Sequence, residues 1–214
     1  MTAVRSEIRR PMTEIRLPLW KRTCDVLVSS LGLLLFSPVI GIIALLIKMD
    51  SRGPVVFRQE RIGQGLRRFS IYKFRTMIED ASKKGGSLTL PNDPRITRVG
   101  RILRESKLDE IPQLFNVLRG EMTLVGPRPE VQQYVNLFRQ DYEEILRVKP
   151  GITDLASLKY RDESPLLAVP DPEQEYIKSI LPDKIALSKE YLRQSSFLFD
   201  LLLLVKTVAK IVVP

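Results

Sequence analysis

Residues 26–47, VLVSSLGLLLFSPVIGIIALLI, decide the fold, because they carry no charged side chain over roughly 22 positions. A helix of this length and composition is long enough to cross the apolar core of a bilayer. The segment is not typical of a signal peptide, since the apolar run is too long and no small-residue cleavage site follows it. The sequence therefore predicts a membrane-associated protein.

The centre of this segment contains Ser37 and Pro38. Proline interrupts the hydrogen-bond ladder of a helix, and a kink there can return the chain to the face from which it entered. Positive residues flank the segment on both sides, so they give no clear orientation, and both ends can be cytoplasmic: Lys21, Arg22, Lys48 and Arg52. Because proline is also frequent in membrane-spanning helices, a straight spanning helix with a mild kink remains the alternative to a re-entrant one.

Composition removes several classes of chemistry. The chain has 214 residues, which suits one domain, and it contains no histidine. Nucleophile pairs that use histidine and imidazole metal sites are therefore excluded. The single cysteine, Cys24, excludes an internal disulfide and every cysteine-cluster metal site. Catalysis would have to use carboxylates, lysine, tyrosine or a carboxylate-bound metal.

The net charge of +9 predicts an anionic partner. Nucleic acid, anionic lipid headgroups and phosphorylated substrates all qualify. The membrane segment favours the last two, and no recognition helix or aromatic-basic sheet motif for nucleic acid is evident.

The acidic pair Asp109-Glu110 is the strongest candidate for chemistry, within RESKLDEIPQLFN at residues 104–116. Pro112 fits only the first turn of a helix, so we expect a helix to begin near Asp109. The positive end of a helix favours ionised carboxylates and attracts phosphate. The alternative is that Asp109 is simply an N-cap.

Two strands, residues 54–61 and 69–77, are expected around a turn at Gly63-Gln64-Gly65. In the second strand Lys73 and Arg75 share a face, which makes them secondary candidates for phosphate binding. Residues 83–94, KKGGSLTLPNDP, are expected to form a flexible loop that either covers a site or is inert.

The remaining helices are expected from about residue 129 to 148, from 182 to 193 and from 197 to 213. We expect the first to bury Tyr134, Leu137, Tyr142, Ile145 and Leu146. The last is highly apolar, and its polar residues fall within an arc of roughly 120°: Ser196, Asp200, Lys206, Thr207 and Lys210. Lys206 and Lys210 are expected to lie among anionic headgroups while the leucines enter the acyl boundary. The alternative is a second spanning helix, which the two lysines and the short length disfavour.

Several segments together resemble the bacterial sugar transferase family, the monotopic small phosphoglycosyl transferases that initiate glycoconjugate assembly. The resemblance covers roughly residues 21–151. It is carried by Lys21-Arg22 and Asp25, Gly53-Pro54-Val55-Val56-Phe57-Arg58-Gln59, Arg61-Ile62-Gly63, Tyr72-Lys73-Phe74-Arg75-Thr76-Met77, Asp93-Pro94-Arg95-Ile96-Thr97 with Gly100-Arg101, Leu108-Asp109-Glu110, Val125-Gly126-Pro127-Arg128-Pro129 and Pro150-Gly151-Ile152-Thr153.

The resemblance implies an α+β fold, a mainly helical catalytic domain with a small β-hairpin and a re-entrant membrane helix broken at Ser37 and Pro38. It implies a monotopic protein on the cytoplasmic face of the bacterial inner membrane. We divide the chain into an interfacial lead-in (1–19), the re-entrant helix (20–50), the catalytic domain (51–195) and a C-terminal interfacial helix (196–214).

The implied reaction moves a phosphosugar from a UDP-sugar to a polyprenol phosphate and releases UMP. Asp109 resembles the family nucleophile that becomes an acyl phosphate near Mg²⁺, with Glu110 as its partner in metal or proton handling. Arg104 and Arg128 resemble phosphate-binding arginines of the family, and a planar guanidinium suits that task. Lys73 and Arg75 are the weaker candidates.

The chain departs from the commoner family pattern at residues 154–163, DLASLKYRDE. Sugar specificity cannot be carried across that departure, and the sequence leaves the sugar, the polyprenol and a homodimer open. The competing hypothesis from another class is a non-catalytic membrane-anchored adaptor that binds anionic lipid.

Overall fold

The computed structural model describes residues 13–81, 86 and 88–212. Most of the expected lead-in and part of the expected loop at 83–94 therefore lie outside the described residues. The helices are α1 (Leu19–Asp50), α2 (Arg98–Glu105), α3 (Gln113–Arg119), α4 (Gln132–Leu137), α5 (Arg139–Ile145), α6 (Leu155–Lys159), α7 (Pro172–Glu175), α8 (Leu181–Gln194) and α9 (Phe197–Val212). The strands are β1 (Val56–Ile62), β2 (Arg68–Phe74), β3 (Thr123–Val125) and β4 (Gly151–Thr153). The predicted mainly helical fold with a small hairpin is confirmed.

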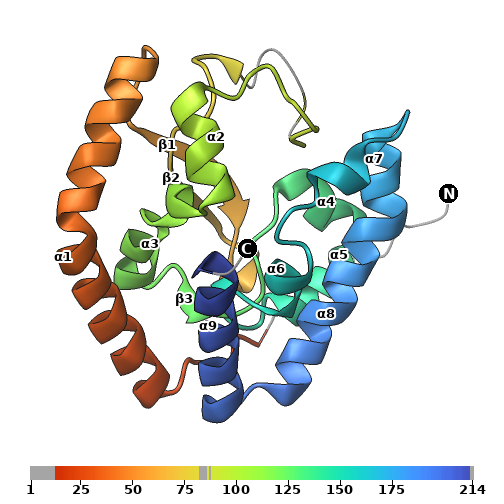
Figure 1. Ribbon diagram of the computed structural model, residues 1–214. Helices are drawn as coiled ribbons and strands as arrows, with labels where there is room; N and C mark the ends of the chain where they lie inside the picture. Colours follow the sequence, from red (N-terminus) through yellow and green to blue (C-terminus); the bar gives the residue numbers. More distant parts are fainter. Residues whose placement is uncertain (1–12, 82–85, 87, 213–214) are drawn as a thin grey trace, which may run out of the picture.

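Helix α1 continues through Pro38 without interruption, and Figure 1 shows that it bends near its middle. Pro38 has no N–H to donate to the carbonyl of Leu34, four residues earlier. The hydroxyl of Ser37 donates to that carbonyl instead, at 2.7 Å. The serine before the proline thus satisfies the acceptor that the proline leaves unpaired, which keeps the helix intact through its bend.

Both ends of α1 are fixed to the same globular body. At its start, the Arg22 guanidinium donates to the carbonyls of Val117 and Leu118 at the end of α3, at 2.6 and 2.8 Å. Near its end, the Asp50 carboxylate accepts from the backbone N–H of Val99 in α2, at 3.0 Å. The two ends of α1 therefore lie against the same domain.

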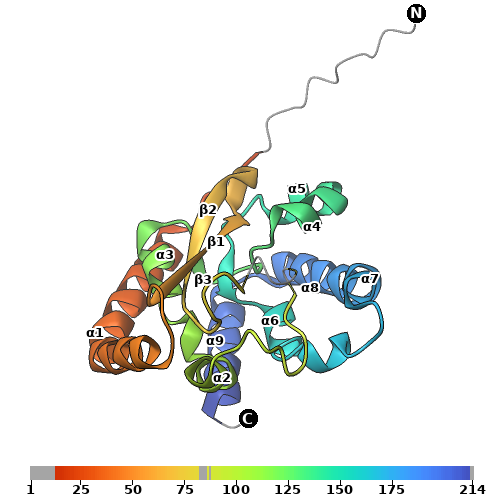
Figure 2. The same cartoon turned by 90° about the horizontal axis from the view of Figure 1, so that it is seen from above.

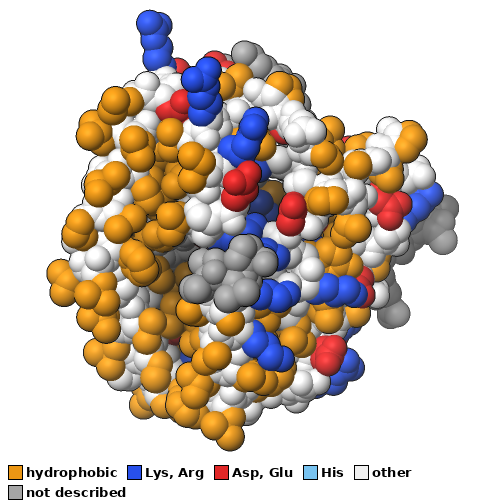
Figure 3. Space-filling model, viewed as in Figure 1, with side chains coloured by type: hydrophobic (Ala, Val, Ile, Leu, Met, Phe, Trp, Pro, Cys, Tyr) orange, Lys and Arg blue, Asp and Glu red, His pale blue; other side chains and the backbone are white. Residues whose placement is uncertain are grey.

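The outward side of α1 is apolar and exposed. Among the described residues, α1 is the helix whose length and composition would allow it to cross a membrane. Figure 3 shows apolar side chains gathered along α1 and at the lower end of α9, with Lys and Arg in the hollow between these helices and the rest of the domain. Apolar side chains of α1 that are more than half exposed include Leu27, Leu31, Leu34, Leu35, Ile42 and Leu45.

Strands β1 and β2 form the predicted antiparallel hairpin, with Val56 opposite Phe74 and Ile62 opposite Arg68. Gly65 adopts a φ of 67° in the turn, a conformation that glycine accepts without steric cost. Figure 2 shows the hairpin between α1 and α3 on one side and the helices α4 to α8 on the other. The hairpin thus lies at the centre of the domain, where its side chains reach both halves.

A second, parallel pair joins β3 to β4, with Thr123 opposite Gly151 and Val125 opposite Thr153. The loops beside this pair approach closely: a Cβ atom on Gly151 would lie 2.1 Å from the Gly126 nitrogen, which requires glycine there. The Asp25 carboxylate of α1 accepts from the Thr123 hydroxyl and the Leu124 N–H, at 2.8 and 3.0 Å. This buried acid therefore attaches the start of α1 to the central pair of strands.

The helix expected over residues 129–148 is two helices. Glu130 pairs with Ile62 through its backbone, so the helical segment begins only at Gln132. Phe138 then leaves helical geometry, with φ of −116° and ψ of 43°, and separates α4 from α5. Tyr134, Tyr142, Ile145 and Leu146 are buried as predicted, whereas the prediction for Leu137 is wrong, since it is 60% exposed.

Helix α8 matches the predicted segment closely, and α9 packs against β3, β4 and α6. Part of the polar arc of α9 faces the domain. The Asp200 carboxylate is buried and pairs with Lys21 of α1 at 2.6 Å and with the Tyr191 hydroxyl at 2.8 Å. Thr207 bonds Thr153 of β4 at 2.7 Å. The exposed side of α9 is apolar: Leu198, Leu201, Leu202, Val205 and Val208.

Candidate active site

The acidic pair lies in a single 3-10 turn, Leu108–Glu110, that follows α2. Lys107 makes the turn between them in a left-handed conformation, with φ of 58°. The helix expected to begin near Asp109 begins at Gln113, with Pro112 at its N-cap position and no side-chain cap. The alternative that Asp109 is an N-cap is therefore wrong. The tight turn places Asp109 and Glu110 under the hairpin.

Glu110 is bound by two cations from different parts of the chain. Lys73 of β2 donates to Glu110 Oε1 at 2.8 Å, and Arg128 Nη2 donates to the same oxygen at 2.5 Å. Arg128 Nη1 reaches Oε2 at 3.3 Å. Burial raises the pKa of Glu110, but Arg128 and Lys73 outweigh that effect and hold this pKa well below its usual range. Glu110 therefore stays ionised.

Asp109 is 7% exposed, and its carboxylate accepts no hydrogen bond from the residues that the structure describes. Burial raises its pKa above the usual value, and the charge on Glu110 adds to that effect. The charges of Lys73, Arg104 and Lys107 act in the opposite direction. Two adjacent carboxyl groups thus have pKa values shifted in opposite directions, a pattern typical of catalytic pairs with different roles.

Arg104 lies on α2 beside this pair without forming an ion pair to it. Its Nε donates to the Thr76 hydroxyl at 2.8 Å, and its Nη1 donates to the Thr89 hydroxyl at 3.0 Å. Burial lowers the pKa of Arg104, while the charge of Asp109 is the largest effect that opposes the lowering. The guanidinium is therefore held by two hydroxyls within the electrostatic reach of Asp109.

Arg128 is placed by the loop between β3 and α4. Its backbone N–H donates to Asp154 Oδ2 at 3.3 Å, and Asp154 is fully buried at the start of α6. The Asp154 carboxylate also accepts from the Ser157 N–H at 2.8 Å and caps α6. Asp154 therefore links the Arg128 loop to α6.

Arg75 is not part of the site, which corrects the prediction of a phosphate role. Its side chain leaves the hairpin toward the end of α1, where Nη2 donates to the carbonyls of Ile47 and Ser51 at 3.2 and 2.7 Å. A cation at these carbonyls complements the negative end of the helix dipole. Arg75 is buried at 6% exposure and has a structural role.

Of the four basic residues predicted for the site, the structure brings three to the acidic pair. Lys73 and Arg128 contact Glu110 directly, and Arg104 interacts with the pair through electrostatics. Sequence analysis missed Lys107, whose ammonium donates to the Arg161 carbonyl at 2.6 Å beside the pair. It also missed Asp154, which an N-cap signal before the run Leu155 to Lys159 would have identified.

The donor groups fit a divalent cation through Asp109 alone. No group of three or more acidic or cysteine side chains suited to a metal is found among the described residues. Both Glu110 oxygens already bind Arg128, and one also binds Lys73, so Glu110 would have to release a cation to become a ligand. Mg²⁺ commonly takes one or two carboxylates and completes its shell with phosphate oxygens and water, which Asp109 permits.

Comparison with known proteins gives one family. The family described as "Bacterial sugar transferase" matches residues 17–214. The chain is 39% identical over 196 residues to a UDP-glucose:undecaprenyl-phosphate glucose-1-phosphate transferase of Escherichia coli, which covers 90% of this chain and 40% of that protein. It is 43% identical over 143 residues to a UDP-N-acetylgalactosamine-undecaprenyl-phosphate N-acetylgalactosaminephosphotransferase of Aeromonas hydrophila, covering 64% of this chain and 33% of that protein.

A shorter relative matches over most of its own length. The exopolysaccharide production protein ExoY of Rhizobium meliloti is 35% identical over 203 residues, which are 88% of this chain and 83% of that protein. The chain spans only a third to two fifths of the two longer relatives. The region matched by the family, residues 17–214, includes the turn with Asp109 and Glu110 and the loop with Arg128.

Proposed function

The chain belongs to the bacterial sugar transferase family, and on that premise we propose that it transfers a sugar phosphate from a UDP-sugar to a polyprenol phosphate. The observation that carries the proposal is the buried Asp109 carboxylate, unpaired among the described residues, beside a Glu110 that two cations bind. The Asp109 carboxylate is thus available to react with a phosphorus atom, whereas Glu110 is held by Lys73 and Arg128. The names of the relatives, which are undecaprenyl-phosphate transferases, support the same reaction.

In the first step, an oxygen of ionised Asp109 attacks the β-phosphorus of the UDP-sugar. The bond from that phosphorus to the bridging oxygen breaks, and UMP leaves with the electron pair. Asp109 then holds the sugar phosphate as an acyl phosphate. In the second step, a phosphate oxygen of the polyprenol phosphate attacks the same phosphorus and releases the Asp109 carboxylate.

The cations around the acidic pair reduce the repulsion between carboxylate and diphosphate. Arg128 offers a planar guanidinium with 37% of its side chain exposed, so it can bind phosphate oxygens while it keeps Glu110. Arg104 and Lys73 add positive charge on either side of Asp109. Such fixed charges stabilise the negative charge that develops as phosphorus changes partners.

We propose Mg²⁺ as the cofactor, with Asp109 as its protein ligand and the remaining positions filled by phosphate oxygens and water. When bound, it would neutralise phosphate charge and make the phosphorus more electrophilic. Glu110, already bound by Lys73 and Arg128, would act by orienting these cations.

We further propose that the protein is monotopic on the cytoplasmic face of the inner membrane, with α1 re-entrant. The globular domain contacts α1 at Arg22 and again at Asp50, so a spanning helix would draw charged parts of the domain into the bilayer. The apolar outer surfaces of α1 and α9 lie on the same molecule face in Figure 3. A protein resting on one leaflet buries both surfaces and leaves the site at the level of lipid phosphates.

The experiment is a single-turnover assay with UDP-sugar and Mg²⁺ but no polyprenol phosphate. We expect a burst of UMP of about one per active site, followed by product formation when the acceptor is added. Asp109→Asn keeps the shape but removes the nucleophile, so it should abolish the burst. Glu190→Gln is the matched control, at a half-buried acid on α8 that accepts a hydrogen bond from Gln194.

A direct displacement would give no UMP without acceptor. Turnover by Asp109→Asn near the wild-type rate would remove the nucleophile assignment. Absence of UMP release from every UDP-sugar tested, with protein that binds anionic vesicles normally, would instead favour the adaptor.

A further inference from the structure

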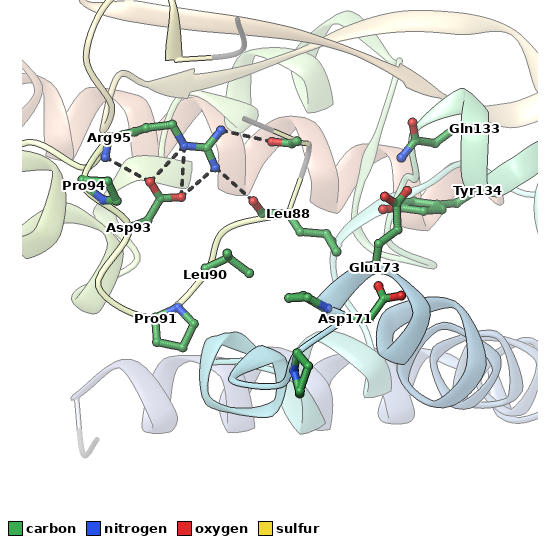
Figure 4. A pocket seen from close by; sticks show the side chains of 13 residues that line it. Leu88, Leu90, Pro91, Asp93, Pro94, Arg95, Gln133, Tyr134, Asp171 and Glu173 are labelled. Atoms are coloured by element: carbon green, nitrogen blue, oxygen red, sulfur yellow. Dashed lines mark hydrogen bonds and ion pairs between the residues drawn. The ribbon is translucent and has the colours of Figure 1, made fainter. Parts of the chain in front are cut away.

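A cavity of about 660 Å³ opens between described residues of the loop that carries Thr89, a partner of Arg104, and residues of helices α4 and α7. Ligand pockets for small molecules commonly have volumes of about 300–1,000 Å³. Figure 4 shows Leu88 and Leu90 on the loop side of this cavity and Gln133, Asp171 and Glu173 on the helix side. We call it the loop cavity.

The loop side of the cavity is held firmly by one ion pair. The Arg95 guanidinium binds both Asp93 oxygens, the shortest contact being 2.6 Å. It also donates to the carbonyls of Gly86 and Leu88, at 3.1 Å each. One arginine thus fixes the described part of the loop that the sequence left open as either a cover or inert.

The loop cavity is connected to the acidic pair through Arg104. Thr89, between Leu88 and Leu90 of the cavity wall, accepts from Arg104 Nη1 at 3.0 Å. Arg104 in turn responds to the charges of both Asp109 and Asp93. A substrate whose phosphates lie at Arg104 would therefore have a neighbouring group within reach of the cavity.

The lining of the loop cavity suits a neutral, hydroxyl-rich group. Among the described residues that line it, the acids are Asp93, Asp171 and Glu173, and the cation is Arg95, which is bound to Asp93. This surplus of carboxylates disfavours phosphate, which Arg104, Arg128 and Lys73 attract elsewhere. Carboxylates accept hydrogen bonds from sugar hydroxyls, and an amide side chain can both accept and donate them. Proline and leucine surfaces pack on the apolar faces of a sugar ring.

We propose that the loop cavity binds the hexose of the sugar nucleotide and selects among donors by the hydroxyl or acetamido groups that the hexose carries. The inference rests on the proposed function, since it assumes that a UDP-sugar places its diphosphate at Arg104. Asp171 and Glu173 are the residues that we assign to hydroxyl recognition, with Gln133 opposite the loop as a further polar contact.

The test measures UMP release by full-length protein with UDP-glucose, UDP-galactose and their two N-acetylated counterparts. The variants are Glu173→Gln, which changes an exposed side chain, and Asp171→Asn, which can still cap α7. We expect each to change the ratio of kcat/KM between preferred and disfavoured sugars by about tenfold, the effect of one hydrogen bond to a charged acceptor. Glu175→Gln on the same helix, outside the cavity lining, should leave the ratios unchanged.

Unchanged sugar ratios in both variants, with normal UMP release, would overturn the hexose assignment while the proposed function stands. A change in preference between UDP and other nucleoside diphosphates at constant sugar ratios would show that the cavity holds the nucleoside, and it would also overturn the assignment. If wild-type protein released no UMP from any donor, the proposed function would fail, and this inference with it.

Discussion

Arg128 Nη2 lies 2.5 Å from Glu110 Oε1, the oxygen that Lys73 also binds. One carboxylate therefore holds a cation from the Arg128 loop and a cation from the hairpin in a single cluster. Asp109, the residue before Glu110, is influenced by the charges of Lys73 and Glu110 but has no direct partner among the described residues. The division of roles within the acidic pair follows from this contact.

Arg128→Lys keeps the positive charge but loses the planar guanidinium that can form bidentate hydrogen bonds. We expect KM for the UDP-sugar to rise and kcat/KM to fall by about tenfold, because an ammonium cannot bind Glu110 and a phosphate in the same plane. Arg128→Ala should cost about a hundredfold or more in kcat/KM. Steady-state UMP release measures both, with Arg139→Lys on α5 as the control. Full turnover by Arg128→Ala would exclude Arg128 from phosphate binding.

Asp109→Asn should stabilise the fold as it removes activity. The raised pKa of Asp109 means that folding favours the protonated acid, so the free energy of unfolding falls as pH rises from 3.8 through that raised pKa. Without Mg²⁺, we expect the variant to gain on the order of 1 kcal/mol at pH 7 and to match wild type below pH 3.8. Denaturant unfolding at both pH values measures this, and lower stability of the variant at pH 7 would contradict it.

Arg75→Ala should lower stability without weakening donor binding. The substitution removes the guanidinium that donates to the Ile47 and Ser51 carbonyls at the end of α1. This loss should lower the free energy of unfolding by about 2 kcal/mol. KM for the UDP-sugar should stay within about twofold, since Arg75 does not reach the acidic pair. Arg68→Ala at the start of β2, where the Arg68 side chain is 63% exposed, is the stability control. A large rise in KM with unchanged unfolding would restore the phosphate role.

The re-entrant arrangement of α1 can be tested with single cysteines at Leu19 and Arg52, in a Cys24→Ser background because Cys24 is exposed. We expect neither site to react with a membrane-impermeant thiol reagent added to spheroplasts, and both to react in inverted vesicles. Labelling of one site alone from the periplasm would show a spanning helix. Replacing Ser37 and Pro38 with Ala and Leu should straighten α1 and favour that spanning form.

Helix α9 offers a matched pair of changes. Leu201 and Val205 are exposed, at 47% and 58%, so replacing both with Gln should weaken membrane association with little effect on unfolding. Leu203 is fully buried between them, and Leu203→Ala should cost about 2–5 kcal/mol in unfolding free energy with little effect on association. Vesicle flotation and thermal unfolding separate the two. The same loss of association in both variants would contradict the assignment.

The hairpin and α8 could be predicted from sequence because their signals are local. A period of two around a glycine turn, and a proline in the first helical turn, specify these elements without tertiary contacts. The break at Phe138 has no such signal. The late start of α4 has no local signal either, because it follows from the pairing of Glu130 with Ile62, 68 residues earlier in the sequence.

Within the site, the types of residue could be predicted from the sequence, but the partners that their side chains contact could not. Lys73 and Arg75 share a strand face by the period of two. Arg75 lies just past the end of β2, however, and its side chain binds a carbonyl at the end of α1 instead. A helical wheel places Asp200 on the polar arc of α9, but it does not show the partner of Asp200, which is Lys21. Long-range ion pairs of this kind depend on which distant elements pack together, and local sequence patterns do not show that.

The contact between Lys21 and Asp200 joins positions 179 residues apart. Chains grow at about 5–20 residues per second, so α1 would precede α9 by about 10 to 40 seconds during synthesis. Throughout that interval Lys21 lacks its carboxylate, and β3 and β4 lack their contacts with α9. The apolar first helix would therefore be present before the domain is closed, and the arrival of α9 would complete the packing around β3 and β4.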